Sequence, residues 1–157
     1  MKTNLVMVGR TSDPWLNTGI SDYYKRISRY IPFQDIVIPD IKKAKNLSEN
    51  LLKEKEGELI LKNILPGDVL VLLDEKGREF TSRQFAQWME KQMASGIKNL
   101  WFVIGGAYGF SPEVYKRADF KISLSQMTFS HQMVRLFFAE QLYRSLTILN
   151  NEPYHHD

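Results

Sequence analysis

The sequence contains no cysteine among its 157 residues. A disulfide framework, a thiolate metal site and a cysteine nucleophile are therefore excluded, and a reducing compartment is favoured. The N-terminal apolar run Leu5–Val8 is too short for a secretory signal, and no apolar stretch approaches membrane-spanning length. We expect a cytoplasmic protein that is neither secreted nor inserted into a membrane.

Several well-known catalytic motifs are also missing. There is no G-x-x-x-x-G-K-[ST] phosphate loop and no G-x-S-x-G nucleophile elbow. The glycines at 105, 106 and 109 do not match G-x-G-x-x-G and follow a late strand rather than the first one. The adjacent histidines His155 and His156 do not converge easily on one ion, and no H-x-x-x-H pair exists, so we predict no bound metal.

What is present is typical of a folded globular chain, with 43% hydrophobic and 25% charged residues. The length suits one domain, which we place at residues 1–157. The net charge of +3 permits a polyanionic partner without requiring one. We name one basic patch as a hypothetical phosphate-contacting surface, although its second half also fits a solvated connector. The patch consists of Lys25, Arg26, Arg29, Lys42, Lys43 and Lys45.

Apolar runs that predict strands alternate with segments that predict helices. The predicted strands are Leu5–Val8, Phe33–Ile38, Asp68–Leu73, Leu100–Ile104 and Lys121–Ser125. The predicted helices are Trp15–Ile31, Glu49–Asn63, Ser82–Ala94, a short one after Ser111-Pro112, and His131–Leu149. This alternation predicts an α/β fold with a largely parallel sheet and helices on both of its faces.

The last predicted helix, His131–Leu149, is apolar on most of its circumference. Such a helix needs cover from more than its own sheet, and a domain this small has few elements left to provide it. A symmetric homodimer is the commonest solution. The alternative is that the helix is simply central in its own fold.

In open α/β sheets ligands bind beyond the carboxyl ends of the strands, which draws attention to three segments. They are Leu73–Gly77, Gly105–Phe110 and Leu124–His131. The glycine loop lets backbone groups approach a flat or anionic ligand, although a tight turn fits it equally well. The third segment mixes hydroxyls with Met127 and Phe129 and could surround an adenine, or could simply connect a strand to a helix.

Several ordered motifs together resemble one family, the SPOUT-class, trefoil-knotted methyltransferases. Within that class they are similar to the RlmH type, which methylates N3 of a pseudouridine in bacterial 23S ribosomal RNA. The motifs are Phe102-Val103-Ile104-Gly105-Gly106, Met127 through Arg135, Glu140-Gln141-Leu142-Tyr143-Arg144 and Pro153-Tyr154-His155. The chain departs from the pattern at Ser130, where proline is common, and runs two residues past Tyr154-His155.

The resemblance implies a C-terminal trefoil knot, a homodimer and ribosomal RNA in assembled ribosomes as the partner. It also implies a pocket for S-adenosylmethionine, the methyl donor. The residues that the resemblance assigns to this pocket are Leu73, Gly105, Gly106, Leu124, Ser125, Gln126, Met127, Thr128 and Phe129. Two other functions stay open: a SPOUT methyltransferase for another ribosomal or transfer RNA position, and a non-catalytic ribosome-binding factor of the same fold.

Four residues are candidates for the chemistry at the base. A uracil-type N3 carries a proton at neutral pH, so the site must remove it or stabilise the resulting anion. We predict that Arg135 holds a phosphate or stabilises that anion, and that Tyr154 and His155 contact or deprotonate the base. His131 lies four residues before Arg135 and could act instead, or could only cap its helix.

Overall fold

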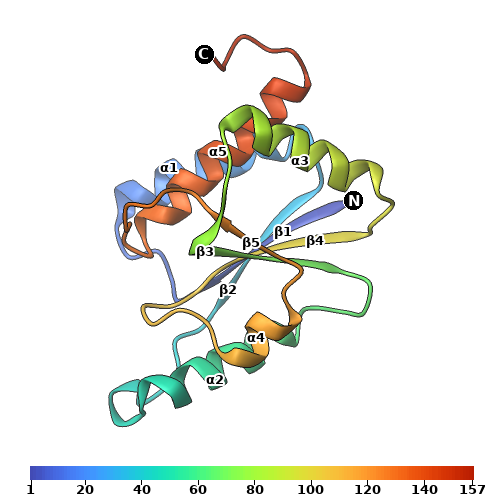
Figure 1. Cartoon of the computed structure of the whole chain (residues 1–157). Coiled ribbons are helices and arrows are strands. Elements are labelled where there is room, and N and C mark those ends of the chain that lie inside the picture. Colours follow the sequence, from blue (N-terminus) through green and yellow to red (C-terminus); the bar gives the residue numbers. More distant parts are fainter.

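A five-stranded parallel sheet forms the centre of the molecule (Figure 1). The computed structural model describes all residues from 1 to 157. The strands are β1 (Lys2–Val8), β2 (Phe33–Ile38), β3 (Val69–Glu79), β4 (Asn99–Ile104) and β5 (Phe120–Ser123). They lie in the order β2-β1-β4-β3-β5, and every neighbouring pair is parallel. The predicted α/β class and parallel sheet are confirmed.

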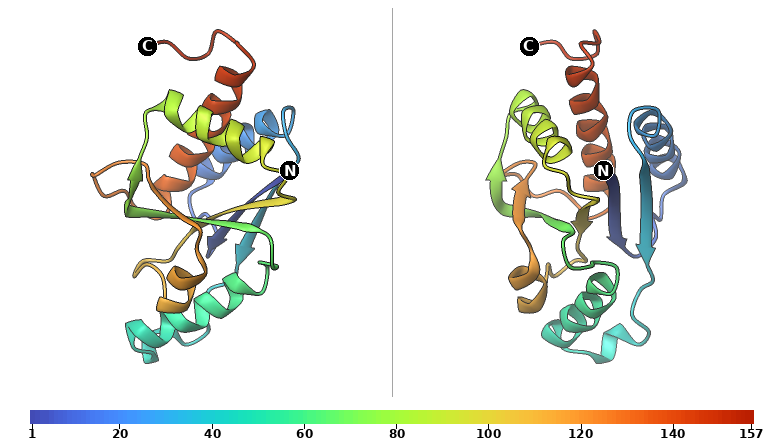
Figure 2. Two further views of the ribbon diagram at one scale, coloured as in Figure 1. Left: turned by 45° about the vertical axis from the view of Figure 1, so that its right-hand side comes forward. Right: turned by 90° about the vertical axis from the view of Figure 1, so that its right-hand side faces the viewer.

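Helices cover both faces of this sheet (Figures 1 and 2). One face carries α1 (Pro14–Ile27), α3 (Ser82–Ala94) and α5 (Met133–Leu149). The other carries α2 (Glu49–Leu61), which follows the short 3₁₀ helix η1 (Ala44–Asn46), and α4 (Pro112–Arg117). None of these helices is long and apolar enough to cross a membrane.

The two helical layers bury separate apolar cores against the sheet. On the α5 side Phe102 of β4 packs with Phe138 and Leu142. On the α2 side, Trp101 and Val103 of the same strand belong to the second apolar core. Successive side chains of a strand point to opposite faces, so a central strand buried on both sides is apolar throughout. This explains the uninterrupted apolar run by which β4 is predicted.

Local signals set where most helices begin. Thr81 and Gln84 form a capping box at the start of α3, and Ser48 and Ser111 accept backbone N–H groups at the starts of α2 and α4. Several predicted boundaries move: α1 ends at Ile27 instead of Ile31, α2 ends at Leu61 instead of Asn63, and α5 begins at Met133 instead of His131. Ends of helices fray into turns, which a periodic pattern does not detect.

β3 is longer than predicted. The sequence places its end at Leu73, but the strand continues to Glu79, and its register against β5 shifts between Leu73 and Arg78. Gly77 permits the close approach in this stretch, since an added Cβ would lie 2.6 Å from the backbone nitrogen of Ile122. The predicted end of this strand at Leu73 is therefore wrong, and Leu73–Gly77 is an irregular continuation of it.

Helix α5 lies between α1 and α3 on one face of the sheet (Figure 2). These neighbours cover much of its apolar circumference within the chain, as the alternative interpretation of this helix anticipated. Among its large apolar side chains, Phe137 is the exposed one, at 40%. The surplus apolar surface that suggested a dimer is thus smaller than the sequence indicates, and it is confined to one side of the helix.

Candidate functional site

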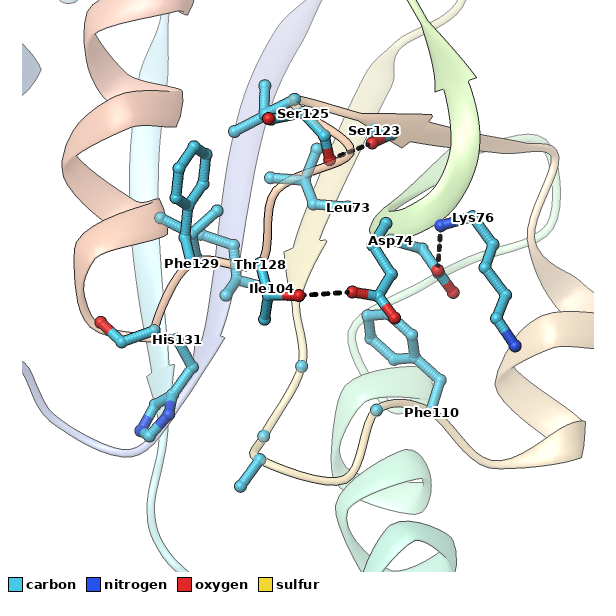
Figure 3. Close-up of a pocket in the computed structure, with 18 of the residues that line it drawn as sticks. Leu73, Asp74, Lys76, Ile104, Phe110, Ser123, Ser125, Thr128, Phe129 and His131 are labelled. Atoms are coloured by element: carbon cyan, nitrogen blue, oxygen red, sulfur yellow. Dashed lines mark hydrogen bonds between the residues drawn. The ribbon is translucent and has the colours of Figure 1, made fainter.

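A cavity of about 600 Å³ lies where the irregular part of β3 after Leu73 meets the carboxyl ends of β4 and β5 (Figure 3). The three segments that the sequence analysis singled out converge on it. In Figure 3, Leu73, Phe110 and Phe129 come from three different parts of the chain and surround the same space. Every residue predicted to bind the cofactor lines this cavity except Gln126, whose side chain is exposed.

The glycine loop after β4 presents unpaired backbone donors. The N–H groups of residues 105, 107 and 108 donate to no acceptor within the chain, and Gly106 pairs with Gly109 in an isolated antiparallel bridge. Gly109, with φ of +83°, closes the loop by donating its N–H to the carbonyl oxygen of Gly106 at 3.2 Å. An added Cβ at Gly105 would lie 3.0 Å from the ring of Phe110, so the backbone packs closely there. Such a loop can offer several N–H groups to one ligand.

The segment after β5 is held in a tight turn by its own side chains. The Ser123 hydroxyl donates to the carbonyl oxygen of Ser125 at 2.9 Å, and the Met127 N–H donates to the Ser125 hydroxyl at 3.0 Å. The N–H groups of residues 125, 126, 128 and 129 donate to no protein acceptor. Free backbone donors beside the apolar Met127 and Phe129 suit a flat, polar-edged ring.

Acidic side chains line the third wall. The Tyr115 hydroxyl donates to Asp74 Oδ2, and the Thr128 hydroxyl donates to Glu75 Oε2 at 3.2 Å. Burial, reinforced by the bond to Asp74, raises the pKa of Tyr115, so this phenol stays protonated. The two carboxylates give the cavity a local preference for cationic ligand groups. Tyr115 could not be identified from the sequence, because nothing in the short helix α4 signals which of its side chains faces a ligand.

His131 lies at the cavity and is free for other contacts. Its imidazole makes no hydrogen bond with the chain. The Ser130 hydroxyl instead accepts the N–H of Met133 at 3.1 Å. Ser130 therefore caps the start of α5, and His131 does not.

Arg135 is fully buried next to His131. Its guanidinium donates to the carbonyl oxygens of Val8 at 2.8 Å and Gly9 at 2.9 Å and to the Thr11 hydroxyl at 3.1 Å. Its Nε donates to the carbonyl oxygen of His131 at 3.2 Å. These bonds fasten the loop after β1 to the start of α5. In this structure the side chain has no exposed group with which to meet the predicted phosphate or base.

Tyr154 and His155 lie at the opposite end of α5 and do not line the cavity. The Tyr154 hydroxyl donates to Glu140 Oε1 at 3.1 Å, and Arg144 Nη1 donates to His155 Nδ1 at 3.2 Å. Since α5 has 17 residues, its two ends are about 25 Å apart. A single chain therefore does not bring these two predicted catalytic residues to His131.

The predicted basic patch is divided between the two edges of the sheet. Helix α1 runs back across the sheet, so Lys25, Arg26 and Arg29 at its end lie at the amino edge. Strand β2 then carries the chain forward to Lys42–Lys45 at the carboxyl edge (Figure 2). The prediction that these residues form one patch in a single chain is therefore wrong. They are close together in the sequence, but the reversal of chain direction through α1 separates them in space. No group of three or more His, Asp or Glu side chains is placed to hold a metal ion.

A model of the family described as "Predicted SPOUT methyltransferase" matches residues 1–155. The chain belongs to the SPOUT methyltransferase family. Proteins named "Ribosomal RNA large subunit methyltransferase H" are similar to it along its whole length. That of Parabacteroides distasonis is 61% identical over 100% of both chains, and that of Flavobacterium psychrophilum 62% over 99% of both.

Two solved structures share the overall fold of this chain at low sequence identity. A probable methyltransferase from Bordetella pertussis has a TM-score of 0.58 at 9% identity, covering 92% of this chain and 94% of that one. A probable methylase family protein from Haemophilus influenzae has a TM-score of 0.53 at 14% identity, covering 99% and 70%. Membership in the SPOUT family implies the trefoil knot that the sequence resemblance predicted.

Proposed function

We propose that this SPOUT methyltransferase transfers a methyl group from S-adenosylmethionine to N3 of a pseudouridine in 23S ribosomal RNA, within assembled ribosomes. The observation that supports this most is the cavity where the three strand-end segments meet. The names of the relatives that are about 60% identical support ribosomal RNA as the substrate. A ribosomal substrate also places the protein in the cytoplasm.

The cavity fits S-adenosylmethionine in size and chemistry. Its volume of about 600 Å³ lies in the range of small-ligand pockets. The unpaired N–H groups of the two loops suit the polar edges of adenine and ribose. Asp74 and Glu75 complement the positive charges of the sulfonium and the amino group. Gln126 belongs to the same turn and would contribute backbone atoms instead of its side chain.

When bound, S-adenosylmethionine supplies a methyl group that its sulfonium already activates. The chain then has to orient the base nitrogen, exclude water and handle the N3 proton. The His131 side chain is exposed at the cavity and makes no hydrogen bond. It can therefore accept the N3 proton or stabilise the charge that develops on the base. We assign Arg135 an indirect part, since its four bonds hold the loop after β1 and the start of α5 in place.

We propose further that the active form is a homodimer in which α5 of one copy packs antiparallel to α5 of the other. Met127 and Phe129 are exposed apolar side chains at the rim of the cavity, and the exposed Phe137 lies beside them, its tilted ring having its centroid 4.7 Å from that of Phe129. A second copy would cover these side chains. The antiparallel arrangement would bring the partner's C-terminal tail, with its copies of Tyr154 and His155, to the cavity that the chain's own tail does not reach.

The side that faces RNA follows from the topology. Lys42, Lys43 and Lys45 are exposed after β2, at the same edge of the sheet as the cavity. Phosphate contacts there would position a folded RNA with its base toward the pocket. The modest net charge of +3 suits a small protein that docks on folded RNA through shape and a few such contacts.

The test is to incubate the purified protein with labelled S-adenosylmethionine and either intact ribosomes or naked ribosomal RNA, and to map any methylated base. We expect one labelled pseudouridine in the large-subunit RNA of intact ribosomes. Label at another ribosomal position or in transfer RNA would contradict the substrate. If calorimetry detected no binding of S-adenosylmethionine, the chain would instead be a non-catalytic binding factor.

A further inference from the structure

Glu56 of α2 is a buried carboxylate that none of the steps above uses. Its side chain is only 6% exposed and makes no hydrogen bond or ion pair within the chain. Its oxygens keep some contact with water, since the fully buried side-chain atoms without a partner are Thr3 Oγ1 and Asn4 Oδ1. A carboxylate so little exposed is nevertheless poorly hydrated and gains from a hydrogen-bond donor. Glu56 lies behind the glycine loop, on the side away from the cavity.

Both carboxylate oxygens of Glu56 lie against the backbone of Gly106. A Cβ added at Gly106 would be 2.7 Å from Oε2 and 3.0 Å from Oε1. Gly106 pairs with Gly109 in an isolated antiparallel bridge, and the N–H group of the next residue, Ala107, has no acceptor in the chain. A little-exposed acceptor without a donor therefore lies close to a loop that has unpaired backbone donors.

The position of Glu56 is fixed by the packing of its helix. The neighbouring Gly57 lies so close to α4 that an added Cβ would be 2.6 Å from the Ser111 hydroxyl and 3.0 Å from Val114 Cγ2. This close packing of α2 on α4 holds Glu56 beside the glycine loop.

The charges around Glu56 do not neutralise it. Burial first, and then the like charge of Asp40 at the end of β2, raise the pKa of Glu56. Asp40 itself faces Gly9, whose added Cβ would lie 2.8 Å from Oδ1, and Arg135 of α5 is the cation that interacts with Asp40. No cation faces Glu56 directly, so backbone N–H groups are the partners left for it.

We propose that Glu56 is a positioning residue that accepts the N–H group of Ala107 and thereby holds the glycine loop in the shape that binds S-adenosylmethionine. The inference rests on the proposed function of the cavity. The carboxylate acts through the loop and does not touch the ligand. The free chain tolerates the unpaired charge, and ligand binding completes its hydrogen bonds.

The test compares wild type with Glu56→Gln, which keeps the shape of the side chain but removes its charge. Glu58→Gln, at an exposed site on the same helix, is the matched control. Calorimetric titration with S-adenosylmethionine at neutral pH should show an affinity about tenfold weaker for Glu56→Gln, because hydrogen bonds to a charged acceptor are the stronger ones. Glu58→Gln should match wild type.

The ligand-free stability separates positioning from a merely structural role. Because the pKa of Glu56 is raised, its ionised form destabilises the free fold above that pKa. The Tm of ligand-free Glu56→Gln should therefore equal or exceed that of wild type at neutral pH. Wild-type affinity should fall as the pH is lowered and Glu56 takes up a proton, while the variant loses that part of the dependence.

Each outcome decides between the two proposals. Equal affinity of wild type and Glu56→Gln would overturn the inference and leave the proposed function standing. If Glu56→Gln had a lower Tm and a proportionally weaker affinity, Glu56 would have only a structural role. That result would also overturn the inference. If wild type itself bound no S-adenosylmethionine, the proposed function would fall and this inference with it.

Discussion

At the scale of single residues, two glycines with opposite surroundings give a matched prediction. An added Cβ at Gly77 meets the β5 backbone at 2.6 Å, whereas one at Gly19, inside α1, meets only the end of Leu136 at 3.4 Å. Gly77→Ala should destabilise the protein by about 1–3 kcal/mol through overpacking. Gly19→Ala should stabilise it by about 0.5–1 kcal/mol through helix propensity.

Urea unfolding of both variants measures these free energies. If Gly77→Ala unfolded at the same urea concentration as wild type, the close contact between Gly77 of β3 and the β5 backbone would be contradicted.

Arg135 gives a second prediction, because its buried bonds indicate a structural task. Arg135→Lys cannot reproduce four N–H donations, and each hydrogen bond from a charged group contributes roughly 1.5–3 kcal/mol. We expect the variant to lose at least about 2 kcal/mol of unfolding free energy. Full stability combined with lost methyl transfer would favour the direct catalytic role that the sequence suggested.

The site residues show where sequence reasoning succeeds and where it stops. Leu73, Gly105 and Leu124 could be identified because parallel strands end at one edge of a sheet, so that the residues after them must meet. The burial of Arg135 could not be predicted. Helical spacing puts it on one face with His131, but nothing local reveals that the loop after β1 covers that face.

At the scale of elements, predictions are accurate where the pattern is strong. The apolar run of β4 predicts its strand to within one residue, and α3 lies at its predicted bounds Ser82–Ala94. The second half of β3 is charged, with Asp74, Glu75 and Lys76, so a strand that bends over its neighbour looks like a loop. Its pairing with β5 is a long-range contact that a local pattern does not encode.

The C-terminal tail after α5 provides an element-scale prediction. Deleting Tyr154–Asp157 removes no residue that lines the cavity, so affinity for S-adenosylmethionine should stay within about twofold of wild type. Methyl transfer to ribosomes should fall about a hundredfold or more, if the tail contributes acid–base groups. Calorimetry and methyl incorporation measure the two effects separately.

Mixing this deletion with a cavity variant such as Gly105→Val tests the dimer. If the tail acts on the partner's cavity, mixed dimers should regain part of the activity that neither variant has alone. Absence of any recovery in mixed dimers would contradict that arrangement.

At the scale of the whole molecule, topology decides more than composition does. The reversal of chain direction through α1 separates two basic clusters that look continuous in the sequence. The same alternation of strands and helices gathers the cavity at one edge and leaves the C-terminal tail at the other. Because the cavity and the tail residues lie at opposite edges of one chain, we propose that a second copy completes the site.

The most direct measurement is a crystal structure of the protein grown with S-adenosylmethionine. We predict the adenosyl group in the cavity among Leu73, Gly105 and Leu124, with hydrogen bonds to the backbone of the glycine loop and of the turn after β5. A ligand bound elsewhere on the molecule, or a cavity that stays empty at saturating concentration, would contradict the account.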